Sequence, residues 1–233
     1  MSRNRFLKLP LQYNVNRLLT DLDECVKTHW QSHFNTADYS GEWTSIALRS
    51  ASGNTDDIYA LPAATGFQNT PLLETCTYFK SIVDGFLCEI EAVRLLSLSP
   101  GSHIKEHRDL HQGYEYGFFR LHIPIKTVPQ VVFRVDGVDM DMQPGECWYA
   151  NFHLPHSVQN NGSEPRIHLI IDGKRNAWSD AIFAGAGYDF EEEKQNLAYD
   201  RDTKLKMIEA LETMDTEASR ELVRKLKLEI QGN

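Results

Sequence analysis

The chain has 233 residues, of which 41% are hydrophobic and 24% charged, as in ordinary globular proteins. Lysine and arginine number 24 against 33 acidic residues, which gives a formal net charge of −9 at pH 7. With no long basic stripe, this charge argues against nucleic-acid binding and favours a small-molecule substrate. No apolar run approaches the roughly 18 residues that span a bilayer, so we expect no membrane association.

The first residues lack the continuous apolar core and the cleavage site of a signal peptide, so we expect a soluble, cytoplasmic protein. The four cysteines are scattered and form no C-x-x-C pair. This spacing argues against a disulfide scaffold and against a structural zinc site.

Near the N-terminus, apolar residues recur at helical spacing after Asn14, which predicts a helix capped by that residue. The sequence TSIALRS, residues 44–50, is typical of a short strand, and residues 72–86 favour a second helix. From about Glu89 the pattern changes to short apolar runs at residues 91–104, 116–125, 130–137, 146–160 and 165–173. Turn pairs such as Asp136-Gly137 and Pro144-Gly145 separate these runs, which predicts a mainly β, jelly-roll core with flanking helices.

After Tyr188 the composition becomes charged and helix-favouring, over residues 189–214 and 215–230. We therefore expect a β-rich, jelly-roll domain with N-terminal helices over residues 1–188 and a charged helical tail over residues 189–233. The tail either packs on the domain or serves as a dimerisation arm, so a homodimer is one expectation.

Seven of the nine histidines fall between residues 103 and 168, within the strand-rich region. The triplet His107-Arg108-Asp109 is the most specific sign of a metal site in this region. Residues i and i+2 of a strand project to one face, so the imidazole and the carboxylate can reach one ion. His156, in a later strand, can supply a third ligand. Two histidines and one carboxylate leave open positions on Fe(II) for a bidentate oxoacid and for O2.

Arg166 opens the strand RIHLIIDG, ten residues after His156. An arginine buried in the mouth of a barrel is costly unless it meets an anion. Its planar guanidinium matches the distal carboxylate of 2-oxoglutarate in a bidentate pair. We therefore expect Arg166 to bind this co-substrate.

Four segments of the sequence resemble the aspartyl/asparaginyl β-hydroxylase family, which includes bacterial hydroxylases of free amino acids such as the cis-proline hydroxylases. They are PGSHIKEHRD, RLHIPI, PGECWYANFHLPHSVQN and RIHLIID. The resemblance implies a double-stranded β-helix (cupin-like) fold. It also implies an Fe(II)- and 2-oxoglutarate-dependent dioxygenase that consumes O2, hydroxylates an unactivated carbon and releases succinate and CO2.

The same resemblance assigns roles to individual residues. It implies that His107, Asp109 and His156 bind the metal and that Arg166 binds the distal carboxylate of 2-oxoglutarate. Arg120 and His122 are expected near the metal-bound end of the co-substrate. Leu96 stands where some relatives have a polar residue that contacts 2-oxoglutarate, so Ser97 or Ser99 is the expected substitute.

We expect the substrate to be a free amino acid or a small derivative. Arg49 and Arg120 are candidates for its carboxylate, Glu115 for its amine, and Trp43 for the pocket wall. Three alternatives stay open: a hydroxylase of peptidyl aspartate or asparagine, a cupin-type metalloenzyme that does not use 2-oxoglutarate, and a catalytically silent binding module.

Overall fold

The computed structural model describes residues 2–59, 66–197, 201–214 and 216–231. The chain forms two compact units, Met1–Asp189 and Phe190–Asn233. Among the described residues, no helix has both the length and the apolar character that crossing a membrane requires.

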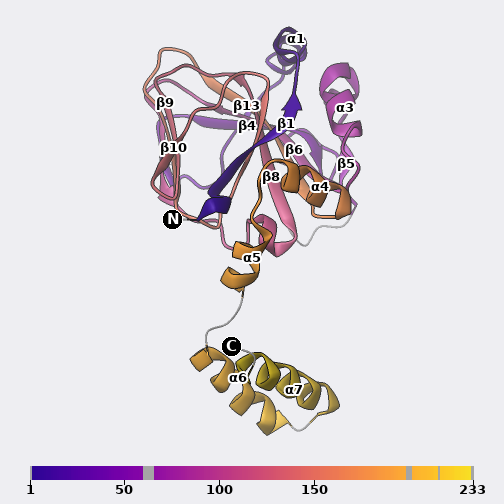
Figure 1. The fold of residues 1–233 in the computed structure, drawn as a ribbon. Helices are drawn as coiled ribbons and strands as arrows, with labels where there is room; N and C mark the ends of the chain where they lie inside the picture. Colours follow the sequence, from indigo (N-terminus) through magenta and orange to yellow (C-terminus); the bar gives the residue numbers. More distant parts are fainter. Residues whose placement is uncertain (1, 60–65, 198–200, 215, 232–233) are drawn as a thin grey trace. The chain divides into compact units, whose positions relative to one another are not determined.

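The first unit is built on two antiparallel sheets (Figure 1). The larger is eight-stranded with the order β1-β11-β8-β13-β6-β4-β2, and β5 pairs with β4 at the side. Its strands are β1 (Phe6–Gln12), β11 (Glu146–Ala150), β8 (Phe118–Lys126), β13 (Arg166–Lys174), β6 (Ile90–Leu98), β4 (Trp43–Ser50), β2 (Gln31–Ser32) and β5 (Gln68–Asn69). The smaller sheet has five strands in the order β10-β9-β12-β7-β3. These are β10 (Val138–Met140), β9 (Val131–Val135), β12 (His156–Asn160), β7 (His103–His107) and β3 (Tyr39–Ser40).

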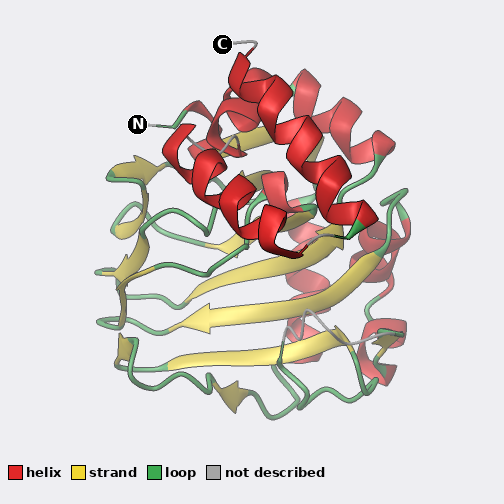
Figure 2. Ribbon diagram, turned by 90° about the horizontal axis from the view of Figure 1, so that it is seen from below, coloured by secondary structure: helices red, strands yellow, loops and turns green. Residues whose placement is uncertain are grey.

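A hydrophobic cluster fills the space between the two sheets. It combines residues of the larger sheet, such as Leu96 and Ile170, with residues of the smaller one, such as Phe133 and Val158. Figure 2 shows the long strands of the larger sheet lying side by side. This arrangement confirms the predicted mainly β, jelly-roll core, a double-stranded β-helix flanked by helices.

Strand β13 lies at the centre of the larger sheet, between β8 and β6. Both of its faces are buried, so its sequence reads as an almost unbroken apolar run instead of an alternating one. Because alternate residues face opposite sides, Arg166, His168, Ile170 and Asp172 share the face that lines the interior. The functional side chains of this strand therefore lie in one row.

Helices cover the outer face of the larger sheet, and Figure 1 shows α1, α3 and α4 on the side away from β9 and β10. The helices of this unit are α1 (Val15–Cys25), α2 (Pro71–Thr75), α3 (Thr77–Asp84) and α4 (Ala177–Gly185). Asn14 caps α1 by accepting a hydrogen bond from the backbone N–H of Arg17, which confirms its predicted role.

The prediction of one helix over residues 72–86 is wrong, because α2 and α3 are separate and Cys76 between them is not helical (φ −86°, ψ 78°). The cause is a contact with α1. Asp21 accepts hydrogen bonds of 2.8 Å from the backbone N–H groups of Tyr78 and Phe79. Its carboxylate thus satisfies the first free N–H groups of α3 and starts a new helix there.

The sequence reading missed strand β1, which pairs with β11 at the edge of the larger sheet. Its leucines at 7, 9 and 11 alternate with Lys8, Pro10 and Gln12, but a proline within a run argues against a central strand and is compatible with an edge strand such as this one. The turn at Asp136-Gly137 was anticipated: both residues have positive φ (51° and 75°), as a tight hairpin between β9 and β10 requires.

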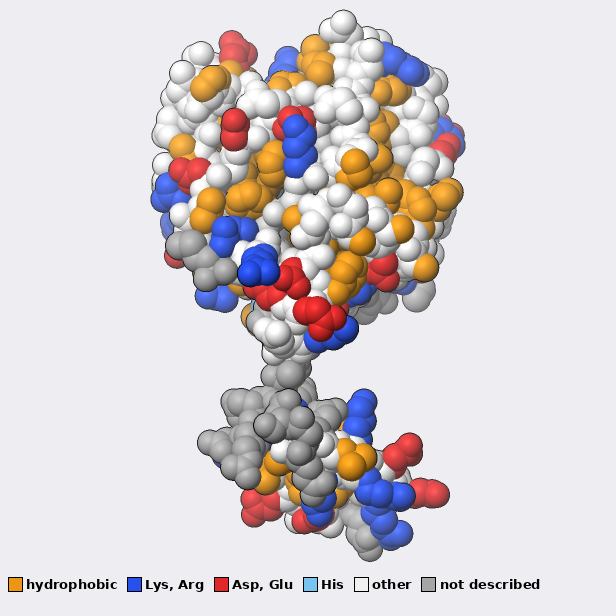
Figure 3. Space-filling model, viewed as in Figure 1, with side chains coloured by type: hydrophobic (Ala, Val, Ile, Leu, Met, Phe, Trp, Pro, Cys, Tyr) orange, Lys and Arg blue, Asp and Glu red, His pale blue; other side chains and the backbone are white. Residues whose placement is uncertain are grey.

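The second unit contains α5 (Phe190–Leu197), α6 (Arg201–Met214) and α7 (Glu217–Gln231). Ile208 of α6 packs with Val223 and Leu226 of α7 to form its small core. On the face of the first unit that is visible in Figure 3, acidic and basic side chains are interspersed and neither sign forms a continuous stripe.

Replacing Asp21 with alanine should lower the free energy of unfolding by about 1–2 kcal/mol, the usual range for losing a helix cap. The substitution leaves two N–H groups of α3 without an acceptor. Urea denaturation, with Asp23→Ala as the matched control on the exposed face of α1, measures the effect. Equal stability of the two variants would contradict the assigned cap.

Candidate metal centre

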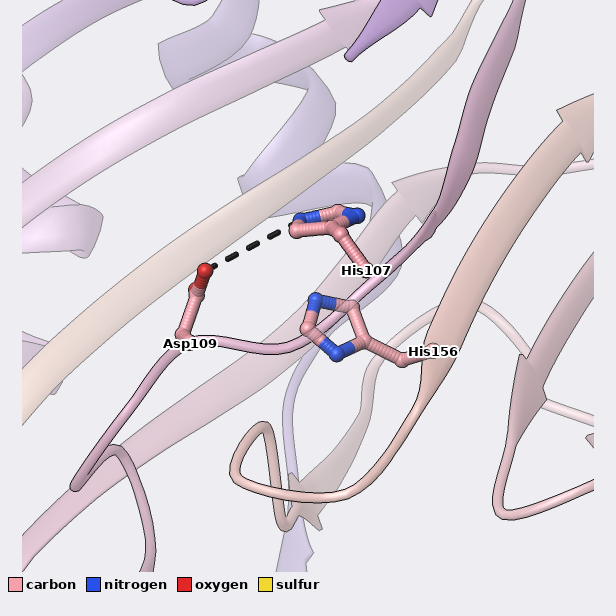
Figure 4. A group of neighbouring side chains, drawn as sticks. All are labelled: His107, Asp109 and His156. Atoms are coloured by element: carbon pink, nitrogen blue, oxygen red, sulfur yellow. Dashed lines mark ion pairs between the residues drawn. The ribbon is translucent and has the colours of Figure 1, made fainter.

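His107, Asp109 and His156 converge at the interior edge of the smaller sheet (Figure 4). His107 is the last residue of β7 and His156 the first of β12, and the two are paired directly in the antiparallel register. One potential ligand atom from each of the three side chains lies within 4.8 Å of the others. This is the one such group of histidine, cysteine and acidic residues that the described part of the chain contains.

Backbone carbonyls fix the orientation of both imidazole rings. His107 Nδ1 lies 2.7 Å from the carbonyl oxygen of Lys105, and His156 Nδ1 lies 3.0 Å from that of Leu154. A carbonyl oxygen can only accept, so each Nδ1 must donate and each Nε2 carries a lone pair. Burial lowers the pKa of His156 to about 4, which keeps that ring neutral, as a metal ligand must be.

Asp109 lies two residues beyond the end of β7, in the following turn and not in the strand itself. Its backbone N–H donates to the carbonyl oxygen of Phe152 at 2.9 Å, so the segment that precedes His156 holds this turn in place. Its carboxylate lies 3.8 Å from His107 Nε2 and 3.5 Å from a guanidinium nitrogen of Arg120. The H-x-D triplet therefore meets at one point through a strand end and an anchored turn.

A small inner cavity of about 60 Å³ adjoins the three residues. Arg166, His122 and Arg120 line it together with the cluster, so the structure brings these predicted site residues to one place. The side chain of Arg166 is buried, and no ion pair with a carboxylate is found for it among the described residues. Burial lowers the pKa of Arg166 to about 9, which still leaves it charged at neutral pH.

An outer cavity of about 450 Å³ shares Trp43, Leu96, His107, Asp109 and Arg120 with the inner one. Its wall includes an aromatic stack: the ring of His33 lies 3.5 Å from that of Trp43 and 4.5 Å from that of Phe34, centroid to centroid. Burial lowers the pKa of His33 to about 4, so its ring is neutral. The predicted wall residue Trp43 thus lines both cavities.

Two arginines of the outer cavity share one buried acid. Asp172 Oδ2 accepts a 2.6 Å hydrogen bond from Arg94, and its Oδ1 accepts a 2.7 Å hydrogen bond from Arg120 Nε. Burial lowers the pKa of Arg94, whereas for Arg120 the attraction of Asp172 outweighs burial and raises the pKa. Arg120 also lies 3.5 Å from the carboxylate of Asp109, so the two arginines and the two aspartates form one charge network at the cavity wall.

Several buried nitrogens around the two cavities have no hydrogen-bond partner among the described residues. Three of them carry hydrogens, namely Trp43 Nε1, Arg94 Nε and Arg166 Nε. His122 Nε2 is also unpartnered. Unsatisfied buried polar groups are rare in native proteins, and donors of this kind suit the oxygen atoms of an anionic ligand.

The structure does not bring three of the predicted contacts to either cavity. Arg49 donates to the carbonyl oxygen of Ile90 and to Asn69, and Glu115 accepts from Asn151. Ser97 alternates with Leu96 and Leu98, which belong to the interior cluster, so it faces the outer side of β6. Neither cavity has Arg49, Glu115 or Ser97 in its lining.

Sequence reasoning missed Arg94, Asp172 and His33. A usable signal was present for the first two, since each is a charged residue within a largely apolar run (EAVRLLSL and RIHLIIDG). A charge that ends up fully buried needs a partner of opposite sign. Nothing in the local sequence marks His33 as a cavity residue.

Comparison with known proteins adds one sequence relative and one solved structure of similar fold. The L-proline cis-4-hydroxylase of Rhizobium meliloti (strain 1021) is 25% identical over 175 residues, which cover 74% of this chain and 61% of that protein. The crystal structure of an oxidoreductase of the 2OG-Fe(II) oxygenase family from Burkholderia pseudomallei matches with a TM-score of 0.50 and 15% identity. That match covers 75% of this chain and 88% of the other, and at this identity it concerns the fold alone.

The chain thus spans less than two thirds of the length of its curated relative. The sequence profile of one family, described as aspartyl/asparaginyl beta-hydroxylase, matches residues 12–176. This segment contains all the strands from β2 to β13, the three clustered side chains and Arg166. The match covers more than half of the chain, and the protein therefore belongs to the aspartyl/asparaginyl β-hydroxylase family.

Proposed function

We propose that the protein is an Fe(II)- and 2-oxoglutarate-dependent dioxygenase that hydroxylates an unactivated carbon of a free amino acid or amino-acid derivative. The observation that carries this proposal is the juxtaposition, in one cavity, of a two-histidine, one-carboxylate cluster and a buried arginine for which the described residues supply no carboxylate partner. The first is the ligand set of non-haem iron oxygenases, and the second is a binding group for a dicarboxylic co-substrate.

The residues fit the metal that this family uses. His107 and His156 both present an Nε2 lone pair, and Asp109 supplies a carboxylate oxygen within the same 4.8 Å group. Three ligands on one face leave the opposite positions open for a chelating oxoacid and O2. When bound, Fe(II) with 2-oxoglutarate and O2 supplies the oxidising power for hydroxylation, with release of succinate and CO2.

The protein's own part is to bind and orient. Arg166 would hold the distal carboxylate of 2-oxoglutarate, while Arg120 and His122 lie where the opposite, metal-bound end would be. Arg120 also contacts Asp109, so it steadies the metal carboxylate. The aromatic wall of His33, Phe34 and Trp43 excludes water and limits the positions that a substrate C–H bond can take.

The outer cavity supports an amino acid as the substrate. The guanidinium groups of Arg94 and Arg120 would receive its carboxylate, and Arg94 Nε has a free N–H for this purpose among the described residues. Asp38 lines the same cavity and supplies a carboxylate for the amine. The similarity to an L-proline cis-4-hydroxylase supports the same substrate class.

Two of the alternatives are weaker for specific reasons. A cupin-type enzyme usually uses three or four histidines, but His122 and His168 lie against each other and outside the ligand group. That alternative also gives the buried Arg166 no task. An internal residue of a peptide has no free amine for Asp38, and a peptidyl asparagine also has no carboxylate for Arg94 and Arg120.

Other features of the protein remain proposals. We propose that residues 1–188 are the oxygenase domain and that residues 189–233 are an appended helical tail. We also propose a cytoplasmic protein that binds neither nucleic acid nor membranes and that can form a homodimer. Light scattering of the full chain in solution would test the last point.

Removing His107 should weaken metal binding. Under anaerobic conditions the wild type should bind Fe(II) and develop the visible charge-transfer band of chelated 2-oxoglutarate, whereas His107→Ala should bind Fe(II) roughly tenfold or more weakly and show no band. Glu106→Ala is the matched control, because Glu106 is the exposed neighbour on β7 and should behave as wild type. Normal Fe(II) binding by His107→Ala would sink the assigned centre.

Removing the Arg166 side chain should weaken the binding of 2-oxoglutarate without changing the binding of the metal. For Arg166→Met we expect unchanged Fe(II) affinity and a Kd for 2-oxoglutarate raised by roughly 10-fold or more, because a charge-assisted bidentate pair is lost. Titration of the charge-transfer band measures this Kd. An unchanged Kd would place the distal carboxylate elsewhere.

Removing the Arg94 side chain should weaken the binding of the amino-acid substrate and leave the binding of 2-oxoglutarate unchanged. Succinate release from 2-oxoglutarate should be stimulated by a free amino acid and not by its amide. Arg94→Met should raise the KM for the amino acid roughly 10-fold or more at constant 2-oxoglutarate affinity, since an ion pair to the carboxylate is lost. Arg134→Met, an exposed arginine of β9, is the control, and equal stimulation by the amide would contradict the assignment.

A further inference from the structure

His168 lies in the middle of the interior row of β13, between Arg166 and Ile170, and the proposed function gives it no role. Its side chain is 1% exposed, in a position that an apolar residue could fill at lower cost. Its Nε2 has no hydrogen-bond partner among the described residues. If the imidazole has a role at this position, its other ring nitrogen, Nδ1, must provide it.

The other nitrogen, Nδ1, is an acceptor. It lies 3.0 Å from a terminal guanidinium nitrogen of Arg166, and a guanidinium can only donate. His168 therefore carries its proton on Nε2 and presents a lone pair to Arg166. Burial lowers the pKa of His168 well below its usual range, which agrees with a neutral ring beside a cation.

The same lone pair also faces His122, whose Nδ1 is 3.3 Å away. Because His168 Nδ1 is already an acceptor, His122 must donate through its Nδ1 in this arrangement. One atom of His168 thus receives N–H groups from two residues that line the inner cavity. Both are residues to which the proposed function assigns 2-oxoglutarate binding.

Arg166 has little else to hold its orientation. In the described part of the chain, His168 is the one hydrogen-bond partner found for its guanidinium, whose other close contact is the ring of Phe133 at 5.4 Å. A ring face attracts a cation but does not fix the rotation of the guanidinium plane. A bidentate pair with a carboxylate depends on that rotation.

We propose that His168 is a positioning residue for the co-substrate, whose Nδ1 orients the guanidinium of Arg166 toward the distal carboxylate of 2-oxoglutarate. This inference rests on the proposed function, because it presupposes that Arg166 binds 2-oxoglutarate. The 3.3 Å contact between the Nδ1 atoms of His168 and His122 links His168 to a second residue that lines the inner cavity. A residue that merely fills space would be replaceable by any side chain of similar volume, which separates the two roles experimentally.

Three substitutions test the role. In His168→Asn the amide oxygen takes the place of Nδ1. In His168→Gln the acceptor lies farther from the backbone. In His168→Leu the side chain has the same shape as asparagine but no acceptor. Circular dichroism and thermal melting would first establish that each variant is folded. Anaerobic titration of the charge-transfer band of the Fe(II)-loaded protein then gives the Kd of 2-oxoglutarate.

We expect His168→Leu and His168→Gln to raise the Kd of 2-oxoglutarate roughly 10-fold, the usual effect of losing a hydrogen bond to a charged group, and His168→Asn to stay within about threefold of wild type. Binding of 2-oxobutyrate, a 2-oxoacid without a distal carboxylate, should change little in any variant because it does not reach Arg166. If His168→Leu does not fold, the contrast between the asparagine and glutamine variants still decides.

Two results would overturn the inference. One is equal 2-oxoglutarate affinity of the Asn, Gln and Leu variants, which would mean that the position is only structural. The other is an equal loss of 2-oxobutyrate binding, which would mean that His168 does not act through Arg166. Failure of the proposed function looks different, since the wild type itself would then show no band with 2-oxoglutarate.

Discussion

The buried guanidinium of Arg166 constrains the rest of the site. A cation inside a protein is tolerated when an anion or several hydrogen-bond acceptors compensate for lost hydration. The structure supplies Arg166 with a single imidazole nitrogen and an aromatic ring. A bound anion would add stabilisation, and the cavity beside Arg166 is also lined by the three side chains suited to a metal. The free protein is therefore arranged for an anion that can also reach the metal.

The alternation of one strand distributes these roles. Along the interior face of β13, Asp172 holds the arginine pair of the outer cavity and His168 accepts from Arg166, to which we assign the distal end of the co-substrate as a proposal. The opposite face of the strand is apolar and packs under the helices. Since β13 is central in its sheet and hydrogen-bonded on both sides, it cannot shift its register without disturbing β6 and β8. The spacing between co-substrate and substrate groups is thus set by the backbone, which suits a reaction that depends on placement.

The parts of the site that the sequence predicted are local in the chain. The H-x-D triplet, His156 before a turn and Arg166 at a strand start each depend on a few neighbouring residues. The substrate side depends on register instead: β4 shifts its pairing with β6 between Ala47 and Arg49, and the Arg49 side chain is directed to Asn69. Arg94, which pairs with Ala47 of β4, lines the cavity in its place. The break between α2 and α3 likewise comes from Asp21, which is more than fifty residues away in the chain. Such tertiary contacts leave no signal in a local window of sequence.

The central claim is that His107, Asp109 and His156 bind one metal ion and that Arg166 receives a 2-oxoacid bound to it. The most direct test is an anaerobic crystal structure with Mn(II) in place of Fe(II) and with 2-oxoglutarate present. The account predicts a metal ion held by the two Nε2 atoms and the aspartate, chelated by the oxoacid, with the distal carboxylate paired with Arg166 and Nδ1 of His168 still accepting from that arginine. A metal bound by other residues, or an oxoacid directed away from Arg166, would contradict it.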